Sequence, residues 1–304
     1  MSSISSPTGS WSPPAHQSSS APLSSPHSSS HAPRRTLLTP TATDSIPPHL
    51  SGAALTIALT SFGLGALASM TFFPSLLALL KQVMSAPISA SESGFRIWPT
   101  LSCSSTSSAL PSLPWQISQF GIYLGAWAIF HMLEFVITAR YNPTRLFTDS
   151  FLLQNGIAYH MAHGGAVIEF LIEGLFFPCM KQPSALTLIG LALMLIGQSA
   201  RSLAMVHAGN SFSHQVAAYK REDHVLVTTG IYSICRHPSY FGFFYWALGT
   251  QLMLANPVGT FVFAGVLYRF FSSRIRQEEI FLVRFFGKAY EDYRSRVPTL
   301  LPFI

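Results

Sequence analysis

The sequence predicts an all-α integral membrane protein with about six transmembrane helices, the last two forming a helical hairpin. Composition is the first reason: of 304 residues, 49% are hydrophobic and 10% charged, against about 25% charged in average soluble domains. The mean hydropathy of +0.36 points the same way. Long apolar stretches, the second reason, need lipid around them. These features exclude an ordinary soluble enzyme.

The charge balance favours a membrane surface over nucleic acid as a partner. The 18 Lys+Arg and 12 Asp+Glu residues give a net charge of +6, which suits anionic lipid headgroups or nucleic acid equally. Because the composition is apolar, lipid is the expected partner and nucleic acid is not. Cys103, Cys179 and Cys235 are an odd number without paired spacing, so they indicate neither a disulfide framework nor a zinc cluster, and no metal site is predicted.

The first 50 residues differ from the rest of the chain. Residues 1–50 are Ser/Pro-rich and carry almost no charge, so they cannot bury enough apolar surface to offset the entropy of ordering. We expect a disordered tail there. The segment also lacks the basic start and apolar run of a signal peptide. Residues 51–304 then form the membrane-embedded domain.

Four apolar stretches are each long enough for one transmembrane helix, which needs roughly 20 residues. They are residues 53–80, 117–139, 151–177 and 184–207. In the second stretch, Gly121 and Gly125 have the small-xxx-small spacing that favours close packing between helices.

A fifth apolar stretch, residues 240–271, is predicted to be a hairpin of two helices. Asn256-Pro257 interrupts it, and proline is disfavoured inside a helix. With six helices, and leaving out Arg201 inside the fourth, 14 Lys and Arg residues fall on one side of the membrane and three on the other. A single span would give seven against ten. The positive-inside rule therefore favours the hairpin, with both termini and the loop 208–239 in the cytosol.

Ionisable residues inside the predicted spans are candidates for function. Three pairs have helical spacing, namely His131 with Glu134, His160 with His163, and Glu169 with Glu173. Their spacings match no zinc-ligand signature. We expect structural hydrogen bonds or the wall of a substrate cavity.

Most other polar residues follow position 207. Residues 269–298 are predicted to be helical, with a break at Gly287. Arg274 and Glu278 lie four residues apart, on one face of that helix. Spacing alone is more typical of a surface ion pair than of a functional site.

Three motifs in this region together resemble the isoprenylcysteine carboxyl methyltransferase family. They are His224-Val225-Leu226-Val227-Thr228-Thr229-Gly230-Ile231-Tyr232, Arg236-His237-Pro238-Ser239-Tyr240-Phe241-Gly242 and Arg274-x-x-x-Glu278-Glu279. With upstream pieces such as His131-x-x-Glu134-Phe135, the resemblance runs from about residue 117 to residue 304. Arg-His-Pro-x-Tyr alone is also similar to membrane phospholipid methyltransferases and sterol reductases.

The resemblance implies a multi-pass enzyme of the endoplasmic reticulum membrane with a cytosolic active site. Such an enzyme uses S-adenosyl-L-methionine to methylate the C-terminal carboxylate of farnesylated or geranylgeranylated cysteine in CaaX-processed proteins, such as small GTPases. Carried over to this sequence, Arg274 would hold the substrate carboxylate. The cofactor pocket, in regions 208–240 and 269–298, would be lined by His224, Val225, Leu226, Val227, Tyr232, His237, Pro238, Ser239, Tyr240 and Glu278.

The sequence departs from the family at one position, and other functions fit part of the pattern. Where the family usually has a Gln seven residues before His224, this chain has Ala217, with Gln215 nearby. The first alternative is a membrane phospholipid or small-lipid methyltransferase with the same pocket. A second is an NADPH-dependent sterol reductase, although no basic cluster for the 2′-phosphate is evident near Tyr232. A scaffold or transporter would leave the polar C-terminal region unexplained.

Overall fold

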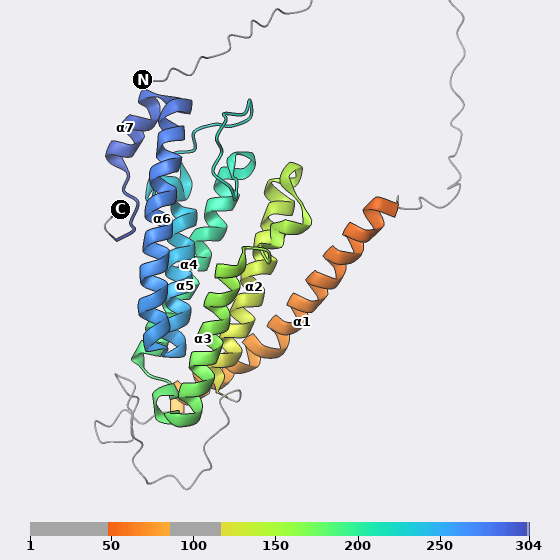
Figure 1. The fold of residues 1–304 in the computed structure, drawn as a ribbon, viewed down its shortest axis with the longest axis vertical. Helices are drawn as coiled ribbons and strands as arrows, with labels where there is room; N and C mark the ends of the chain where they lie inside the picture. The colour runs from red at the N-terminus through yellow and green to blue at the C-terminus, as the bar shows by residue number, and fades with distance from the viewer. Residues whose placement is uncertain (1–47, 86–116, 303) are drawn as a thin grey trace, which may run out of the picture. The chain divides into compact units, whose positions relative to one another are not determined.

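The computed structural model describes residues 48–85, 117–302 and 304, and the regular elements within these ranges are all helical (Figure 1). The α-helices are α1 (Pro48–Ser85), α2 (Ser118–Tyr141), α3 (Ile157–Phe176), α4 (Ala185–Ala208), α5 (Pro238–Leu254), α6 (Pro257–Phe286) and α7 (Lys288–Arg296). Within the described part, three segments are long and apolar enough to cross a membrane, namely Ala53–Met84, Ser118–Tyr141 and Ala185–Ser211. The all-helical membrane class is confirmed. Of the predicted tail over residues 1–50, residues 1–47 lie outside the described residues, and residues 48–50 belong to α1.

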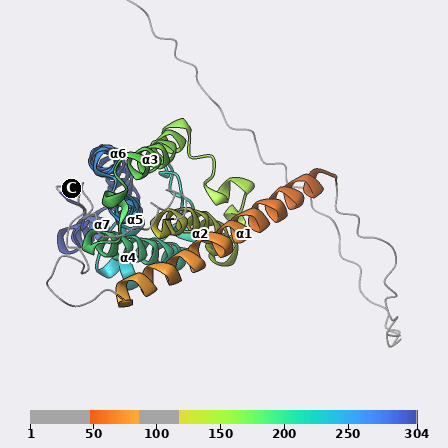
Figure 2. The same ribbon diagram turned by 90° about the horizontal axis from the view of Figure 1, so that it is seen from below.

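Helices α1 and α2 pack through glycine. The two helices cross, as Figure 2 shows, and the glycines of α2 face α1. A Cβ atom added at Gly121 would collide with the Ser75 hydroxyl, and one at Gly125 would collide with the Phe72 backbone. The close packing predicted from the small-xxx-small spacing is therefore confirmed.

A second set of glycines joins α4 to α5. Gly190 and Gly197 of α4 face Gly249 and Gly242 of α5, so the two antiparallel backbones are in direct contact. A Cβ atom at Gly242 would lie only 2.6 Å from the Arg201 backbone nitrogen. The close approach holds the start of α5 against α4, and the motif Arg236-His237-Pro238 lies just before that contact.

Replacing Gly197 with valine should clearly destabilise the folded protein. The added side chain would collide with the Trp246 backbone, and overpacking a well-packed contact costs about 1–3 kcal/mol or more. The thermal unfolding midpoint of the detergent-purified variant measures the loss. Gly164→Val on α3 is the matched control, because a Cβ atom there meets nothing within 4 Å. Equal midpoints for the two variants would contradict this packing.

The main core lies where α2, α4, α5 and α6 meet. Phe130, Trp246 and Met253 are fully buried there, and the rings of Phe130 and Trp246 lie 4.5 Å apart. Leu301, after α7, also packs into this core. The C-terminal segment therefore packs back against the helices that position the motifs.

The third helix begins later than the sequence predicts. Phe151 is buried at the end of the 3-10 helix η3 (Thr148–Phe151), while Leu152 and Gly156 have φ angles of 55° and 83°. Left-handed residues break a helix, so α3 starts only at Ile157. The prediction of a span over 151–177 was wrong for its first six residues, because hydropathy does not separate a buried loop residue from a helical one.

The predicted hairpin and the predicted break after it are both confirmed. Ala255 has a φ angle of 53° and ends α5, and Pro257 takes the first position of α6, where its missing N–H is not needed. α6 runs to Phe286, and Gly287, with a φ angle of 53°, separates it from α7. The turn of the hairpin lies at one end of the helices and α7 at the other (Figure 1).

A buried lysine ties α3 to the turn of the hairpin. The Lys181 Nζ lies 2.6 Å from Glu173 Oε2 and 2.9 Å from Asn256 Oδ1. It also donates to the carbonyl oxygens of Leu254 and Ala255, at 3.1 and 2.9 Å. Burial lowers the pKa of Lys181, and Glu173 opposes that shift. Four acceptors thus surround one ammonium group at the end of α5.

Glu169 fixes the start of α6 in the same region. Its two carboxylate oxygens accept hydrogen bonds from the backbone N–H groups of Val258 and Gly259, both at 2.8 Å. A carboxylate at a helix N-terminus satisfies unpaired donors and interacts favourably with the helix dipole. Glu169 and Glu173 are therefore structural hydrogen-bonding groups, which is one of the two roles expected for them.

Candidate functional site

A pocket opens where the α4–α5 loop, the start of α5, the last turns of α6, and α7 come together. Its empty space, counted together with the open mouth, is about 680 Å³. Its lining residues are Ala208, Ser211, Phe212, Ser213, His224, Val225, Leu226, Val227, Tyr232, Arg236, His237, Pro238, Ser239, Tyr240, Glu278, Leu282, Phe286, Tyr290 and Tyr293.

The structure brings together in this pocket all ten residues that the resemblance assigns to the cofactor. Residues 224–227 come from the loop, Tyr232 from the 3-10 helix η6 (Gly230–Ser233), and Glu278 from α6. Pro238 begins α5 at its first position, and the residues on either side of it line the pocket as well. Segments more than 50 residues apart in sequence therefore share one site.

Three polar atoms at this pocket are buried without a hydrogen-bond partner among the described residues. They are His224 Nδ1, Glu278 Oε2 and the Tyr290 hydroxyl. Buried polar atoms in folded proteins almost always have a partner, so this pocket suits a polar ligand. S-adenosylmethionine carries hydroxyl, amino and carboxylate groups on a partly apolar frame, and these residues fit it.

Burial shifts the pKa values of several groups at the site. It raises those of Tyr232 and Tyr290, which disfavours the phenolate form of both still further. Burial, together with the positive charge of Arg221, lowers the pKa of His224. The His224 ring packs against Phe286, 5.4 Å between centroids, so it forms part of an apolar wall.

Arg274 does not line the pocket but lies directly behind one of its residues. Its Nε donates to the Tyr240 hydroxyl at 2.9 Å, and its guanidinium stacks over the Tyr240 ring, 5.4 Å from the centroid. Its Nη2 donates to the His214 backbone carbonyl. The guanidinium is therefore fixed at the border between the pocket and the aromatic side chains of α5 and α6, including Phe270.

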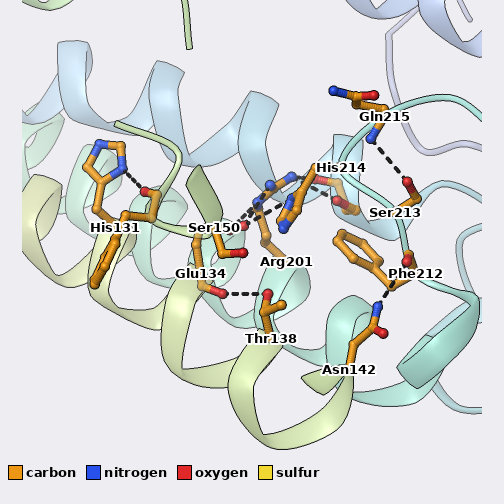
Figure 3. A network of polar contacts seen from close by, with 12 residues as sticks. His131, Glu134, Thr138, Asn142, Ser150, Arg201, Phe212, Ser213, His214 and Gln215 are labelled. Atoms are coloured by element: carbon orange, nitrogen blue, oxygen red, sulfur yellow. Dashed lines mark hydrogen bonds and ion pairs between the residues drawn. The ribbon is translucent and has the colours of Figure 1, made fainter. Parts of the chain in front are cut away.

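A buried ion pair lies next to this border and was not predicted. Arg201 of α4 donates through Nε to Glu134 Oε1 at 2.5 Å and through Nη2 to Glu134 Oε2 at 3.0 Å (Figure 3). Its Nη1 donates to the Ser239 hydroxyl at 2.8 Å. His214 faces Glu134 Oε2 at 3.6 Å, and burial lowers the pKa of His214 to about 4. The pair thus joins α2 and α4 to a pocket residue and to the loop that holds Arg274.

Two of the remaining intramembrane histidines make structural hydrogen bonds, whereas His160 is exposed and makes a ring contact with Tyr159. His131 bonds the Phe151 carbonyl at 2.6 Å and the Tyr159 hydroxyl at 2.7 Å, and His163 bonds the Tyr123 hydroxyl at 2.7 Å. The prediction of structural hydrogen bonds is confirmed for these two histidines.

Sequence reasoning missed part of the pocket wall. Tyr290 and Tyr293 are supplied by α7, and the Tyr293 hydroxyl donates to the Tyr232 carbonyl at 2.6 Å. The sequence did carry a signal for these two residues: they lie three residues apart after the predicted break at Gly287, and therefore on one face of a helix. Neither Ala217 nor Gln215 lines the pocket, and Gln215 is exposed, so Gln215 does not replace the usual Gln in this structure.

Comparison with known proteins agrees with these motifs. Residues 188–284 match the model of the isoprenylcysteine carboxyl methyltransferase family. The chain is 46% identical over 195 residues to the protein-S-isoprenylcysteine O-methyltransferase of Saccharomyces cerevisiae, covering 62% of this chain and 82% of the yeast protein. The chain belongs to the isoprenylcysteine carboxyl methyltransferase family.

A human relative and a solved structure match a similar share of the chain. The human protein-S-isoprenylcysteine O-methyltransferase is 44% identical over 187 residues, covering 62% of this chain and 66% of the human protein. A solved structure of the eukaryotic intramembrane Ras methyltransferase is 41% identical, with a TM-score of 0.61 over 65% of this chain and 69% of that chain.

Proposed function

We propose that this protein transfers a methyl group from S-adenosyl-L-methionine to the C-terminal carboxylate of prenylated cysteine. The observation that carries the proposal is the single pocket that gathers all ten expected cofactor residues, with Arg274 bonded to Tyr240 at its edge. The relatives named as protein-S-isoprenylcysteine O-methyltransferases support the same reaction. The substrates would be prenylated CaaX-type proteins such as small GTPases, in line with the solved Ras methyltransferase.

The reaction requires the protein mainly to bind the two reactants and to exclude water from them. When bound, S-adenosylmethionine supplies a methyl group on a positively charged sulfur. A C-terminal carboxyl group, with a pKa of roughly 3.5, is already ionised at pH 7, so no side chain has to act as a general base. The pocket residues hold the cofactor, and the buried surroundings remove water from the carboxylate. Alignment and desolvation then account for most of the acceleration.

Arg274 fits the task of holding the carboxylate. A guanidinium can bind a carboxylate through two parallel N–H bonds without giving up a proton. Its Nε and Nη2 are anchored on Tyr240 and on the His214 carbonyl, which fixes the direction of the group. The ring of Phe270 beside it gives an apolar flank on the side where a prenyl chain would approach.

We also propose six spans in the endoplasmic reticulum membrane, with the pocket on the cytosolic side. The basic residues of α7 and the end of α6 lie at the pocket end, in line with the positive-inside rule. At the opposite end, next to the hairpin turn, Cys179 is disulfide-bonded, which the cysteine count did not predict. Disulfides persist in the oxidising lumen, which supports this orientation.

The test uses membranes that express the full chain, with radiolabelled S-adenosylmethionine. N-acetyl-S-farnesylcysteine and a phospholipid are offered as acceptors in parallel. We expect base-labile label on the farnesylcysteine, as a methyl ester requires. Label on the phospholipid alone would move the function to lipid methylation, and label on neither acceptor would refute both methyltransferase functions.

A further inference from the structure

Glu279 lies next to Glu278 in the sequence but makes different contacts. Its Oε1 accepts a hydrogen bond from Arg236 Nε at 2.7 Å and lies 3.2 Å from His237 Nε2. Its Oε2 lies 3.6 Å from an Arg294 nitrogen. Unlike Glu278, Glu279 does not line the pocket. Glu279 therefore contacts Arg236 and His237, which come just before α5, from the side away from the pocket.

Glu279 is one of three side chains that contact the His237 ring. His237 is almost fully buried, and its ring stacks on Tyr240 with centroids 5.6 Å apart and planes within 9°. Its other nitrogen, Nδ1, lies 3.7 Å from Glu278 Oε2 at the pocket. A carboxylate that accepts from one ring nitrogen fixes both the tautomer and the orientation of an imidazole.

Glu279 is itself held in place. Arg236 donates from Nη1 to the Val297 carbonyl at 2.9 Å, and its backbone N–H donates to the Pro298 carbonyl at 3.0 Å. Burial would raise the pKa of Glu279, but the hydrogen bonds from His237 and Arg236 outweigh it and lower the pKa to about 2. The C-terminal segment after α7 thus anchors Arg236, which anchors Glu279.

We propose that Glu279 is a positioning residue for the cofactor site. Its carboxylate orients His237, so that the Nδ1 edge of His237 and the Glu278 carboxylate together face the bound cofactor. Glu279 itself touches no substrate or cofactor atom. The inference rests on the proposed function, because it takes the ligand of the pocket to be S-adenosylmethionine.

The test compares Glu279→Gln with the wild-type full chain, purified in detergent. Glutamine keeps an oxygen in the place of Oε1, which faces both Arg236 and His237, but it removes the negative charge and puts an amide nitrogen in the place of Oε2. We expect the Kd for radiolabelled S-adenosylmethionine to rise at least tenfold, while the KM for farnesylcysteine stays within twofold. Glu291→Gln is the matched control, because Glu291 is an exposed glutamate on α7. The Kd of this variant for S-adenosylmethionine should equal that of the wild type.

A double-mutant cycle separates positioning from a general loss of structure. If Glu279 acts through His237, adding Glu279→Gln to His237→Ala should change the Kd less than twofold. An equal loss in both backgrounds, or a wild-type Kd in Glu279→Gln, would overturn the proposal. If the glutamine variant does not purify as a single species, Glu279→Asp replaces it, with a smaller rise expected because the charge remains. A wild-type chain that binds no S-adenosylmethionine would instead refute the proposed function.

Discussion

Arg274→Ala should abolish methyl transfer to a prenylcysteine while leaving cofactor binding intact. Truncating one partner of a desolvated charged contact costs about 2–5 kcal/mol, so we expect kcat/KM for farnesylcysteine to fall by roughly 10²–10³-fold. The cofactor Kd should stay within about threefold of the wild-type value, because Arg274 does not line the pocket itself. It contacts the pocket through Tyr240, which does line it. Radiolabel transfer and equilibrium binding measure the two quantities separately.

Two variants sharpen this test. Arg274→Lys keeps the charge but not the planar fork, so its activity should lie between those of the wild type and the alanine variant. Arg276→Ala is the matched control, since Arg276 is exposed and bonds only the Ser272 carbonyl of its own helix among the described residues. A kcat/KM within tenfold of wild type in Arg274→Ala would remove Arg274 from the carboxylate role.

The sequence predicted well the features that depend on local chemistry. Asn256-Pro257 and Gly287 mark real helix ends, because proline and glycine act on the backbone where they stand. The motif residues converge in one pocket, which the resemblance implied and spacing alone did not. Arg274 and Glu278 illustrate the difference: four residues apart on a helix is a common surface pattern, and only the resemblance separated them from it.

What the sequence did not predict depends on distant partners. Glu134 and Arg201 are 67 residues apart, and nothing in either helix shows that they pair. The same holds for Lys181, whose acceptors Leu254 and Asn256 lie more than 70 residues away. Hydropathy also misplaced the start of α3, because it measures how apolar a segment is and not the backbone conformation. Whether a charged side chain is buried can be determined only when the tertiary packing is known.

Lys181→Met should be among the most destabilising single substitutions in the chain. The substitution removes an ammonium group that donates hydrogen bonds to three oxygen atoms at the hairpin turn. It also leaves the Glu173 carboxylate without its partner. Breaking a buried ion pair from one side costs about 3–5 kcal/mol, because the remaining charge stays buried. The midpoint of thermal unfolding in detergent should fall accordingly. Lys288→Met is the control: its pair with Asp292 is largely exposed, and such pairs contribute about 0–1 kcal/mol.

A second substitution distinguishes charge imbalance from loss of packing. Adding Glu173→Gln to Lys181→Met removes the unpaired carboxylate, so part of the lost stability should return. If the double variant is as unstable as the single one, the carbonyl groups of Leu254 and Ala255 carry the cost instead. Methyl transfer should fall only with the folded fraction, at unchanged KM, because the hairpin turn and the pocket lie at opposite ends of α5. A raised KM with full stability would mean that the turn acts on the site directly.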